Sequence, residues 1–541
     1  MAVHASLGVP RSDADTPITL VLLCQNLERS TSRLELASLG SWLSSHRKGV
    51  KVGLVEDLCH QPSVIRSAVR RVGAQRLVLG LCSKSYAEVE LPTHARRAGL
   101  DPLGIQMVDL GNSPGRDAFP AAVNARARVL LAAAVARARA FTGSQPENLK
   151  TVLLSSGQRI SRRALFALPP VSYATVPTIS QTMCAAKDGC DQCVRACPHT
   201  ALEKDGDAIL VNRSQCESCG TCVAVCPQRA VEFPGWSPEE LEAQVASLLD
   251  AQTDLEVKAV AFSCKNAPIS AGNGWLPVRV PCASMVSIQA ILETLARGAS
   301  AVALQRCGEQ CTTGLAETLG KRVDYCQQLL QRLGGPSESK RVCLLSTEQT
   351  THPGSVPALS PPPGEISRGA LTLFGRGVAA RAVMGLAARH GVKTLVLEHL
   401  YSPLGIVEID PQACTACSTC ASACPTGAIT SERRDDEVVM VFDASICTAC
   451  GLCESSCPEK AEGAIRVSRV TDTDRLSLGP QVLSQDQESR CERCGAPVAT
   501  RRMLQRIAAL LGKDYNPQFM ERRCISCRVE GTGTSTSSSV P

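Results

Sequence analysis

Residues 216–227 read CESCGTCVAVCP, a run of four cysteines whose last member precedes a proline. Two residues separate each of the first three cysteines, and three residues precede the fourth. This is the spacing of bacterial modules that hold two [4Fe–4S] clusters, in which three thiolates of a run bind one cluster and the fourth binds the other. The run therefore predicts a small α+β module with two clusters and crossed ligands.

A second cysteine run lies just upstream and supplies the other half of this module. It contains Cys184, Cys190, Cys193 and Cys197, and its first cysteine stands three residues earlier than the regular spacing requires. Lys187 occupies the regular position, so we expect Cys184 to remain a ligand, with a short loop inserted after it. Crossed ligation then assigns one cluster to Cys184, Cys190, Cys193 and Cys226, and a second cluster to Cys216, Cys219, Cys222 and Cys197.

The same module recurs, in regular form, in the C-terminal half of the chain. Residues 414–425 read CTACSTCASACP and residues 447–458 read CTACGLCESSCP. The repetition indicates an internal duplication of the two-cluster fold. By the same crossing, one cluster is expected on Cys414, Cys417, Cys420 and Cys457, and the other on Cys447, Cys450, Cys453 and Cys424.

Cysteine content and hydropathy bound the class of protein. The chain has 541 residues, 29 cysteines and a formal net charge of +6, and most of the cysteines stand in CxxC arrays. Such arrays favour a metal framework in a reducing compartment over a disulfide scaffold. The N-terminus is polar, and the longest apolar helical run, 129–140, is interrupted by Arg137 and Arg139. We therefore expect a soluble cytoplasmic protein without a transmembrane segment and without a nucleic-acid partner.

Residues 17–142 alternate strand-like and helix-like runs, ending in a long helix expected over 121–141, and this rhythm predicts an α/β domain with a parallel sheet. The stretches VEDLCHQPSVIRSAVRRVGAQRLVLGLCSKSY and AGLDPLGIQMVDLGN resemble the N-terminal domain of the flavin-containing subunit of heterodisulfide reductase. The resemblance implies a cluster here, but only Cys24, Cys59 and Cys82 remain, and Asn112 to Pro114 stand near the last family cysteine. A further cluster and buried structural thiols are both left open.

Residues 239–346 predict a second α/β domain with a parallel sheet and cysteines at the ends of three strands, where such folds hold ligands. The stretch VPCASMVSIQAILETLARGASAVALQRCGEQC resembles the delta subunit of methyl-viologen-reducing hydrogenase. The resemblance implies a [2Fe–2S] cluster, although Lys265 follows Cys264 where that family has another cysteine. Reduced buried thiols are the alternative. The implied ligands are Cys264, Cys282, Cys307 and Cys311.

One stretch of the sequence is similar to a dinucleotide-binding fingerprint, with Gly375, Gly377 and a later acidic residue, Glu398. A complete nucleotide-binding domain needs further βαβ units, yet the cluster module at Cys414 begins almost at once. We expect a helical spacer, with flavin or nicotinamide binding as the alternative.

Two CxxC pairs near the C-terminus suit a tetrahedral zinc knuckle. A rubredoxin-like iron site and a site without metal are the alternatives. The four cysteines are Cys491, Cys494, Cys524 and Cys527.

The expected organisation is two α/β domains, two two-cluster ferredoxin domains and a C-terminal knuckle. The predicted boundaries are 1–142 and 239–346 for the α/β domains, 143–181 for a connector, 182–238 and 406–470 for the ferredoxin domains, 347–405 for a Pro/Ser linker and helical spacer, 485–530 for the knuckle and 531–541 for a disordered tail.

Each predicted iron–sulfur cluster takes up and releases one electron at a time. The chain contains no P-loop, HExxH motif or nucleophile elbow. The domain order, with CAAKDGCDQCVRACP and the CERCG and CISCR pairs, resembles multi-cluster ferredoxin-type proteins that are related to heterodisulfide reductase but lack its flavin domain. The resemblance implies an electron-transfer subunit of a formate dehydrogenase-like or heterodisulfide reductase-like complex. Its partners would be molybdenum or flavin oxidoreductase subunits or a soluble carrier. The alternatives are an oxidoreductase with its own site near Gly375 and a structural or sensory iron–sulfur protein.

Overall fold

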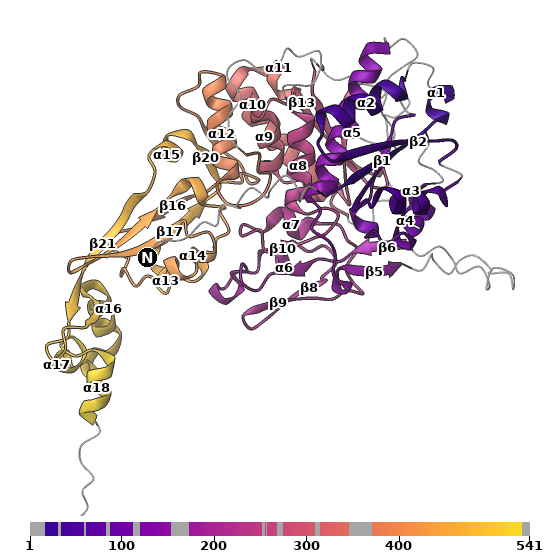
Figure 1. The fold of residues 1–541 in the computed structure, drawn as a ribbon. Helices are drawn as coiled ribbons and strands as arrows, with labels where there is room; N and C mark the ends of the chain where they lie inside the picture. Colours follow the sequence, from indigo (N-terminus) through magenta and orange to yellow (C-terminus); the bar gives the residue numbers. More distant parts are fainter. Residues whose placement is uncertain are drawn as a thin grey trace, which may run out of the picture. The chain divides into compact units, whose positions relative to one another are not determined.

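A computed structural model describes residues 17–30, 34–58, 61–82, 87–111, 120–152, 172–250, 255, 257–267, 274–308, 314–345 and 370–532 (Figure 1). The chain divides into two compact units. The first unit comprises residues 1–182, 193–203 and 210–374, and the second comprises 183–192, 204–209 and 375–541.

The first unit begins with a four-stranded parallel sheet in the order β2-β1-β3-β4. Its central strand β1 reads TLVLLC and is buried throughout, as expected of a parallel strand covered on both faces. The strands are β1 (Thr19–Cys24), β2 (Val50–Val55), β3 (Arg76–Leu81) and β4 (Gln106–Asp109). The helices are α1 (Asn26–Ser30), α2 (Leu36–His46), α3 (Val64–Val72), α4 (Ala87–Arg97) and α5 (Pro120–Ala140). The predicted parallel sheet is confirmed.

A second parallel sheet in this unit repeats the same order of strands, β12-β11-β13-β14. The strands are β11 (Ala259–Cys264), β12 (Trp275–Val280), β13 (Ala301–Gln305) and β14 (Val342–Leu345). The helices around it are α8 (Pro238–Leu248), η6 (Ala283–Met285, a 3-10 turn), α9 (Ile288–Ala296), α10 (Ala316–Gly334) and α11 (Pro336–Ser339). In both sheets the first strand in sequence is an inner strand, and its carboxyl end carries a cysteine.

Two arginines of α5, Arg126 and Arg137, serve the packing of the two α/β domains. Arg137 is 4% exposed and donates to the carbonyl oxygens of Gly235 and Arg279. Arg126 donates to the carbonyl oxygen of Trp275 in β12, and burial lowers its pKa to about 10. These guanidinium groups satisfy carbonyl oxygens at a buried contact, where a polar group without a hydrogen-bond partner is costly.

The first cysteine-rich module lies between the two sheets in sequence. Short antiparallel pairs frame it: β5 (Leu149–Val152) with β6 (Ser172–Thr175), and β7 (Thr178–Ile179) with β10 (Val231–Glu232). Its remaining elements are η4 (Ala186–Asp188), α6 (Gln192–Ala196), β8 (Leu202–Asp205), β9 (Ala208–Val211) and α7 (Thr221–Val225).

The second unit contains the second module, built on antiparallel strands. β16 (Ile406–Ile409) pairs with β19 (Ile465–Ser468), and β15 (Val396–Glu398) pairs with β20 (Val470–Asp472). A four-stranded sheet joins β17 (Ile429–Arg434), β18 (Glu437–Phe442), β21 (Gln481–Arg490) and β22 (Pro497–Thr500). Figure 1 shows β21 leading from this sheet to the C-terminal helices. The helices are α12 (Val378–Arg389), α13 (Thr419–Ser422), α14 (Leu452–Ser455), α15 (Thr473–Ser477), α16 (Arg501–Leu511), α17 (Pro517–Met520) and α18 (Ile525–Thr532).

The glycine-containing segment before α12 packs on the second module. Arg376 donates to the carbonyl oxygen of Thr426 at 2.9 Å, and Gly377 lies against Ile446. The strand after the helix, β15, pairs antiparallel with β20. A dinucleotide fold would place this strand in a parallel sheet, so the observed pairing favours the helical spacer.

Among the described residues, no helix is both long and apolar enough to cross a bilayer.

Candidate metal centres

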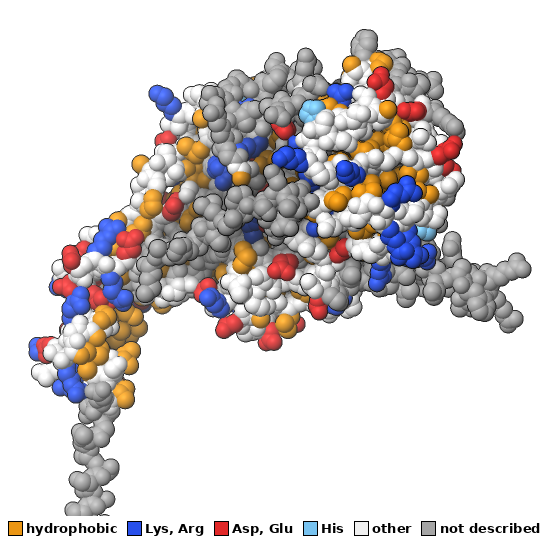
Figure 2. Space-filling view, viewed as in Figure 1, with side chains coloured by type: hydrophobic (Ala, Val, Ile, Leu, Met, Phe, Trp, Pro, Cys, Tyr) orange, Lys and Arg blue, Asp and Glu red, His pale blue; other side chains and the backbone are white. Residues whose placement is uncertain are grey.

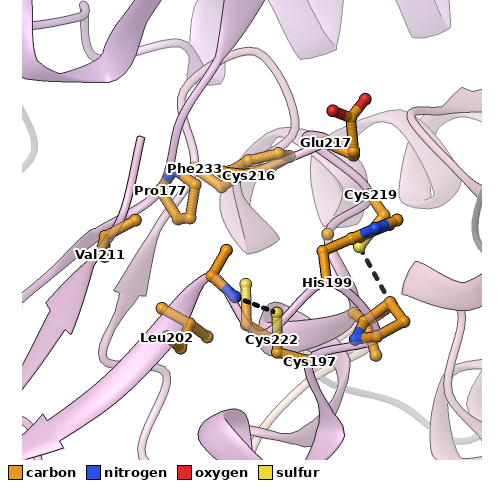
Figure 3. A pocket seen from close by; sticks show the side chains of 14 residues that line it. Pro177, Cys197, His199, Leu202, Val211, Cys216, Glu217, Cys219, Cys222 and Phe233 are labelled. Atoms are coloured by element: carbon orange, nitrogen blue, oxygen red, sulfur yellow. Dashed lines mark hydrogen bonds between the residues drawn. The ribbon is translucent and has the colours of Figure 1, made fainter. Parts of the chain in front are cut away.

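Four cysteines of the first module line one cavity of about 370 Å³, a volume that includes space open to solvent. Figure 3 shows their side chains around it, with Pro177, Leu202, Val211 and Phe233 forming apolar walls. The cavity brings together Cys197, Cys216, Cys219 and Cys222. Three of these precede or begin α7, and the fourth precedes Pro198 in the other run.

The second module has two such cavities, of about 340 and 300 Å³, again including space open to solvent. In each, three cysteines come from one run and the fourth from the other run. The first cavity contains Cys414, Cys417, Cys420 and Cys457, and the second contains Cys424, Cys447, Cys450 and Cys453. The structure thus groups the cysteines in the crossed sets that the spacing predicts.

Unusual backbone conformations recur at equal positions in these runs. Ser218, Ala416 and Ala449, each two residues after the first cysteine of its run, have φ of 54°, 50° and 50°. Non-glycine residues rarely adopt positive φ, and such strain persists where the surroundings require it. Two positions later the backbone is again left-handed, before α7, α13 and α14 begin. In each run, these turns occur where three thiols converge on one cavity.

Backbone amides hydrogen-bond the cysteine sulfurs. The N–H groups of Ala201 and Ala230 donate to Cys197 Sγ and Cys226 Sγ, each at 3.3 Å. In the second module Ala416 N–H donates to Cys414 Sγ at 3.4 Å. Donors aimed at a sulfur favour its negatively charged form, which is the form that binds iron.

The thiols of these sets are buried beside one another. Burial raises the pKa of Cys222 well above its ordinary value and raises that of Cys420 and of Cys447 to about 12, and neighbouring cysteines add to these shifts. A bound metal cation reverses this effect, because it stabilises thiolates directly. The donor sets therefore fit iron–sulfur clusters.

The fourth predicted set is divided between the two units. Cys193 lies near enough to Cys222 for their charges to interact, and both belong to the first unit with Cys226. Cys184 and Cys190 belong to the second unit. The loop between them forms η4, closed by a hydrogen bond from Cys190 N–H to Ala185 O at 3.2 Å. This turn contains the residues that shift Cys184 from the regular spacing, and the ligand role of Cys184 stays a prediction.

Three cysteines gather at the carboxyl edge of the second parallel sheet. Cys264 ends β11, Cys282 follows β12 and Cys307 follows β13. A hydrogen bond with Cys282, together with burial, raises the pKa of Cys264, and charge on Cys307 raises it further. Cys311, the fourth predicted ligand, lies outside the described residues. Cys326 is buried within α10.

Two cysteines of the N-terminal sheet also approach each other. Cys24 Sγ at the end of β1 lies 3.7 Å from Cys82 Sγ, just after the adjacent strand β3. Cys59 and residues 112–114 lie outside the described residues, so a further cluster at this edge stays a prediction.

The C-terminal knuckle places four sulfurs within 4.8 Å of one another, and the set is Cys491, Cys494, Cys524 and Cys527. Cys494 Sγ lies 3.5 Å from Cys524 Sγ and 3.6 Å from Cys527 Sγ. A tetrahedral zinc ion with bonds of about 2.3 Å needs sulfurs separated by about 3.8 Å. Backbone hydrogen bonds, the strongest involving Cys524, lower the pKa of Cys491 to about 6, which favours the thiolate form that binds metal. The knuckle thus fits a divalent metal such as zinc.

Large apolar side chains are exposed beside the knuckle. Leu510, Ile525 and Val529 are 69%, 75% and 66% exposed. Figure 2 shows apolar side chains gathered on one side of the segment formed by α16 to α18. Apolar patches of this kind are typical of protein–protein contact surfaces.

Comparison with protein-family models matches residues 183–230 and 413–461 to the 4Fe-4S dicluster domain. Residues 259–356 match the family described as methyl-viologen-reducing hydrogenase, delta subunit. No curated protein matches the chain. The matched ranges contain the two duplicated cysteine modules and all four strands of the second parallel sheet. The chain therefore carries two ferredoxin-type 4Fe-4S dicluster domains and one domain similar to the delta subunit of methyl-viologen-reducing hydrogenase.

Proposed function

We propose that this chain is an electron-transfer subunit that relays single electrons between redox partner proteins. The observation that carries the proposal is the repeated four-thiol cavity, found once in the first unit and twice in the second among the described residues. The proposed complement is four [4Fe–4S] clusters, one [2Fe–2S] cluster and one zinc ion. When bound, each cluster can take up and release one electron.

The chain's own residues hold these centres and tune them. Thiolates supply the ligands, and the N–H groups of Ala201, Ala230 and Ala416 partly neutralise the charge on the sulfurs. Burial and apolar walls, such as Phe233 beside the first cavity, limit water at the centres. Solvent exposure and hydrogen bonds to sulfur are two of the factors that set a cluster's potential.

The reaction served is proposed from the resemblance to multi-cluster proteins related to heterodisulfide reductase. We propose a formate dehydrogenase-like or heterodisulfide reductase-like complex, in the cytoplasm, where thiolate ligands stay reduced. A flavin or nicotinamide site near Gly375 is disfavoured by the antiparallel pairing of β15. A structural or sensory role needs fewer centres than this chain provides.

The metal content tests the proposed cofactors. Protein purified without oxygen should contain about sixteen to eighteen irons and about one zinc per chain, since four cubes need sixteen irons and the [2Fe–2S] site two more. Elemental analysis with parallel protein quantification measures this. A value of eight irons or fewer in fully reconstituted protein would contradict the four-cube assignment.

The relay role predicts that the isolated chain has no dehydrogenase activity. Hydride and formate chemistry moves two electrons and uses flavin, nicotinamide or molybdenum cofactors, whereas a cluster passes one electron. Assays with NAD(P)H, formate or hydrogen against a viologen dye should give no turnover by the chain alone, and turnover once its redox partner is added. Turnover by the isolated chain with bound flavin or pterin would overturn the relay assignment.

A further inference from the structure

The part of the first dicluster domain that belongs to the first unit contacts the delta-subunit-like domain of the same unit directly beside their cysteines. The contact joins residues 219–221, where α7 begins, to residues 282–286, which contain η6. We call these two segments the domain junction. Thr221 Oγ1 lies 2.8 Å from Ser284 Oγ, and the two residues are 3% and 0% exposed. The junction is therefore a buried contact with a hydrogen bond at its centre.

A glycine on one side of the junction lies close against Met285. A Cβ atom on Gly220 would lie 2.9 Å from the sulfur of Met285, and Gly220 has φ of 77°. The corresponding residues of the second module are Ser418 and Gly451, and no side chain closes on Gly451 in the same way. Gly220 thus lets η6 approach the cysteine run more closely than a side chain would allow.

The junction has a proposed cluster ligand at each side. Cys219 precedes Gly220 directly, and Cys282 precedes η6 directly. Cys219 belongs to the four-thiol cavity and Cys282 to the cysteines at the sheet edge.

A chain of hydroxyl groups crosses the junction and ends on Cys219. Cys219 Sγ lies 3.4 Å from Thr221 Oγ1, which in turn contacts Ser284 Oγ. A thiolate can only accept, so with Cys219 as a ligand the Thr221 hydroxyl donates to sulfur and accepts from Ser284. Arg322 fixes the far end, because its Nη1 donates to the carbonyl oxygens of Ser284 and Val286, each at 2.8 Å.

The second module offers an internal comparison. Cys417 Sγ lies 3.3 Å from Thr419 Oγ1, the same cysteine–threonine pair at the start of α13. Thr419 is only half-buried, whereas Thr221 is covered by the junction. A second domain thus covers the Thr221 hydroxyl beside Cys219 and adds a further hydroxyl, that of Ser284, to the hydrogen-bonded chain.

We propose that the domain junction is the electron-exchange contact between the [4Fe–4S] site of Cys197, Cys216, Cys219 and Cys222 and the [2Fe–2S] site of the delta-subunit-like domain. Ser284, from the second domain, raises the potential of the first site through Thr221. One electron leaves one centre and the other gains it, and no bond forms or breaks. This inference rests on the proposed function, because it requires both centres to be present.

The physical reason is that a hydrogen bond to a ligand sulfur stabilises the reduced, more negative cluster. In a buried site such bonds strengthen, and a second hydroxyl polarises the first. At a fixed ambient potential, removing the Thr221 hydroxyl should therefore lower the ratio of reduced to oxidised cluster at this centre about tenfold. For a one-electron couple, this corresponds to a decrease of about 59 mV in its reduction potential. Removing the Ser284 hydroxyl should give a smaller change of the same sign, about threefold, because Thr221 still donates.

The test is an EPR-monitored redox titration of the full-length, reconstituted protein and of Thr221→Ala, Ser284→Ala and Thr221→Ser. The two alanine variants should shift the same [4Fe–4S] signal to lower potential, and Thr221→Ser should restore it. Thr419→Ala is the matched control and should shift a different signal. Equal thermal midpoints and iron contents would show that the variants are folded and loaded.

A second readout tests adjacency without a change of potential. In fully reduced protein, magnetic coupling to the neighbouring centre should broaden the [2Fe–2S] signal. Cys197→Ala, which removes a ligand of that neighbour, should sharpen this signal, and Cys424→Ala in the second module should not. Unchanged reduction potentials in Thr221→Ala and Ser284→Ala would contradict the proposed role of the junction and leave the proposed function standing. Equal effects of Cys197→Ala and Cys424→Ala on the width of the [2Fe–2S] signal would do the same. A wild-type protein without [4Fe–4S] signals would overturn the proposed function and the junction together.

Discussion

Replacing Cys457 by alanine is expected to destroy the cluster assigned to Cys414, Cys417 and Cys420, some forty residues away in sequence. It should spare the cluster assigned to Cys447, Cys450 and Cys453, the cysteines of its own run. The reason is the composition of the two cavities, because Cys457 lines the first and Cys424 lines the second. Without Cys457 this [4Fe–4S] cluster has only three thiolate ligands. We therefore expect the cluster to be lost, which removes about four irons per chain.

Two matched variants sharpen this test. Cys424→Ala should remove the opposite cluster and leave the one completed by Cys457. Cys343→Ser replaces a half-buried cysteine of β14, outside every predicted set, and should leave all clusters in place. EPR spectra of the reduced proteins, with iron analysis, distinguish the three variants. Selective loss of the Cys447, Cys450 and Cys453 centre from Cys457→Ala would show that each run binds its own cluster.

Removing the metal of the knuckle is expected to unfold residues 491–532 while the iron content stays unchanged. The buried apolar cluster around this metal site consists of three of its cysteines, with Ala496 and Val498 packed against them. In α16 only Leu504 is buried. So small a core cannot hold a segment of this length, and a structural zinc ion contributes binding free energy of about 10–16 kcal/mol in small zinc domains.

A zinc-selective chelator, or the variant Cys524→Ser, should release about one zinc per chain. Hydrogen exchange measured by mass spectrometry should then show loss of protection in α16 and α18. The second module should keep its protection, because its own core is separate, with Val438, Met440 and Phe442 at its centre. Cys343→Ser again serves as the control. A knuckle that keeps its protection after the metal has left would contradict a structural role for the ion, and iron in place of zinc would indicate a rubredoxin-like site.

The sequence by itself determined the features that depend on near neighbours. The CxxC spacings predict the four-thiol sets because a few residues of turn bring three sulfurs together, as Ser218 and Ala449 do with positive φ. Alternating strand and helix patterns predict both parallel sheets, and the long helix expected over 121–141 is observed as Pro120–Ala140. The match of the family models to residues 183–230, 413–461 and 259–356 follows from the same local patterns.

Only the tertiary structure decided which distant segments meet. Arg137 reads in sequence as a break in an apolar run, but it is a buried donor to Gly235 and Arg279. Thr221 and Ser284 are ordinary hydroxyl residues 63 positions apart, and nothing in their local sequence indicates that they hydrogen-bond across two domains. The physical reason is that spacing and periodicity report contacts along one turn or strand. The packing of one domain on another depends instead on the shape of the complete surface. At Gly220, for example, the absence of a side chain lets Met285 approach closely.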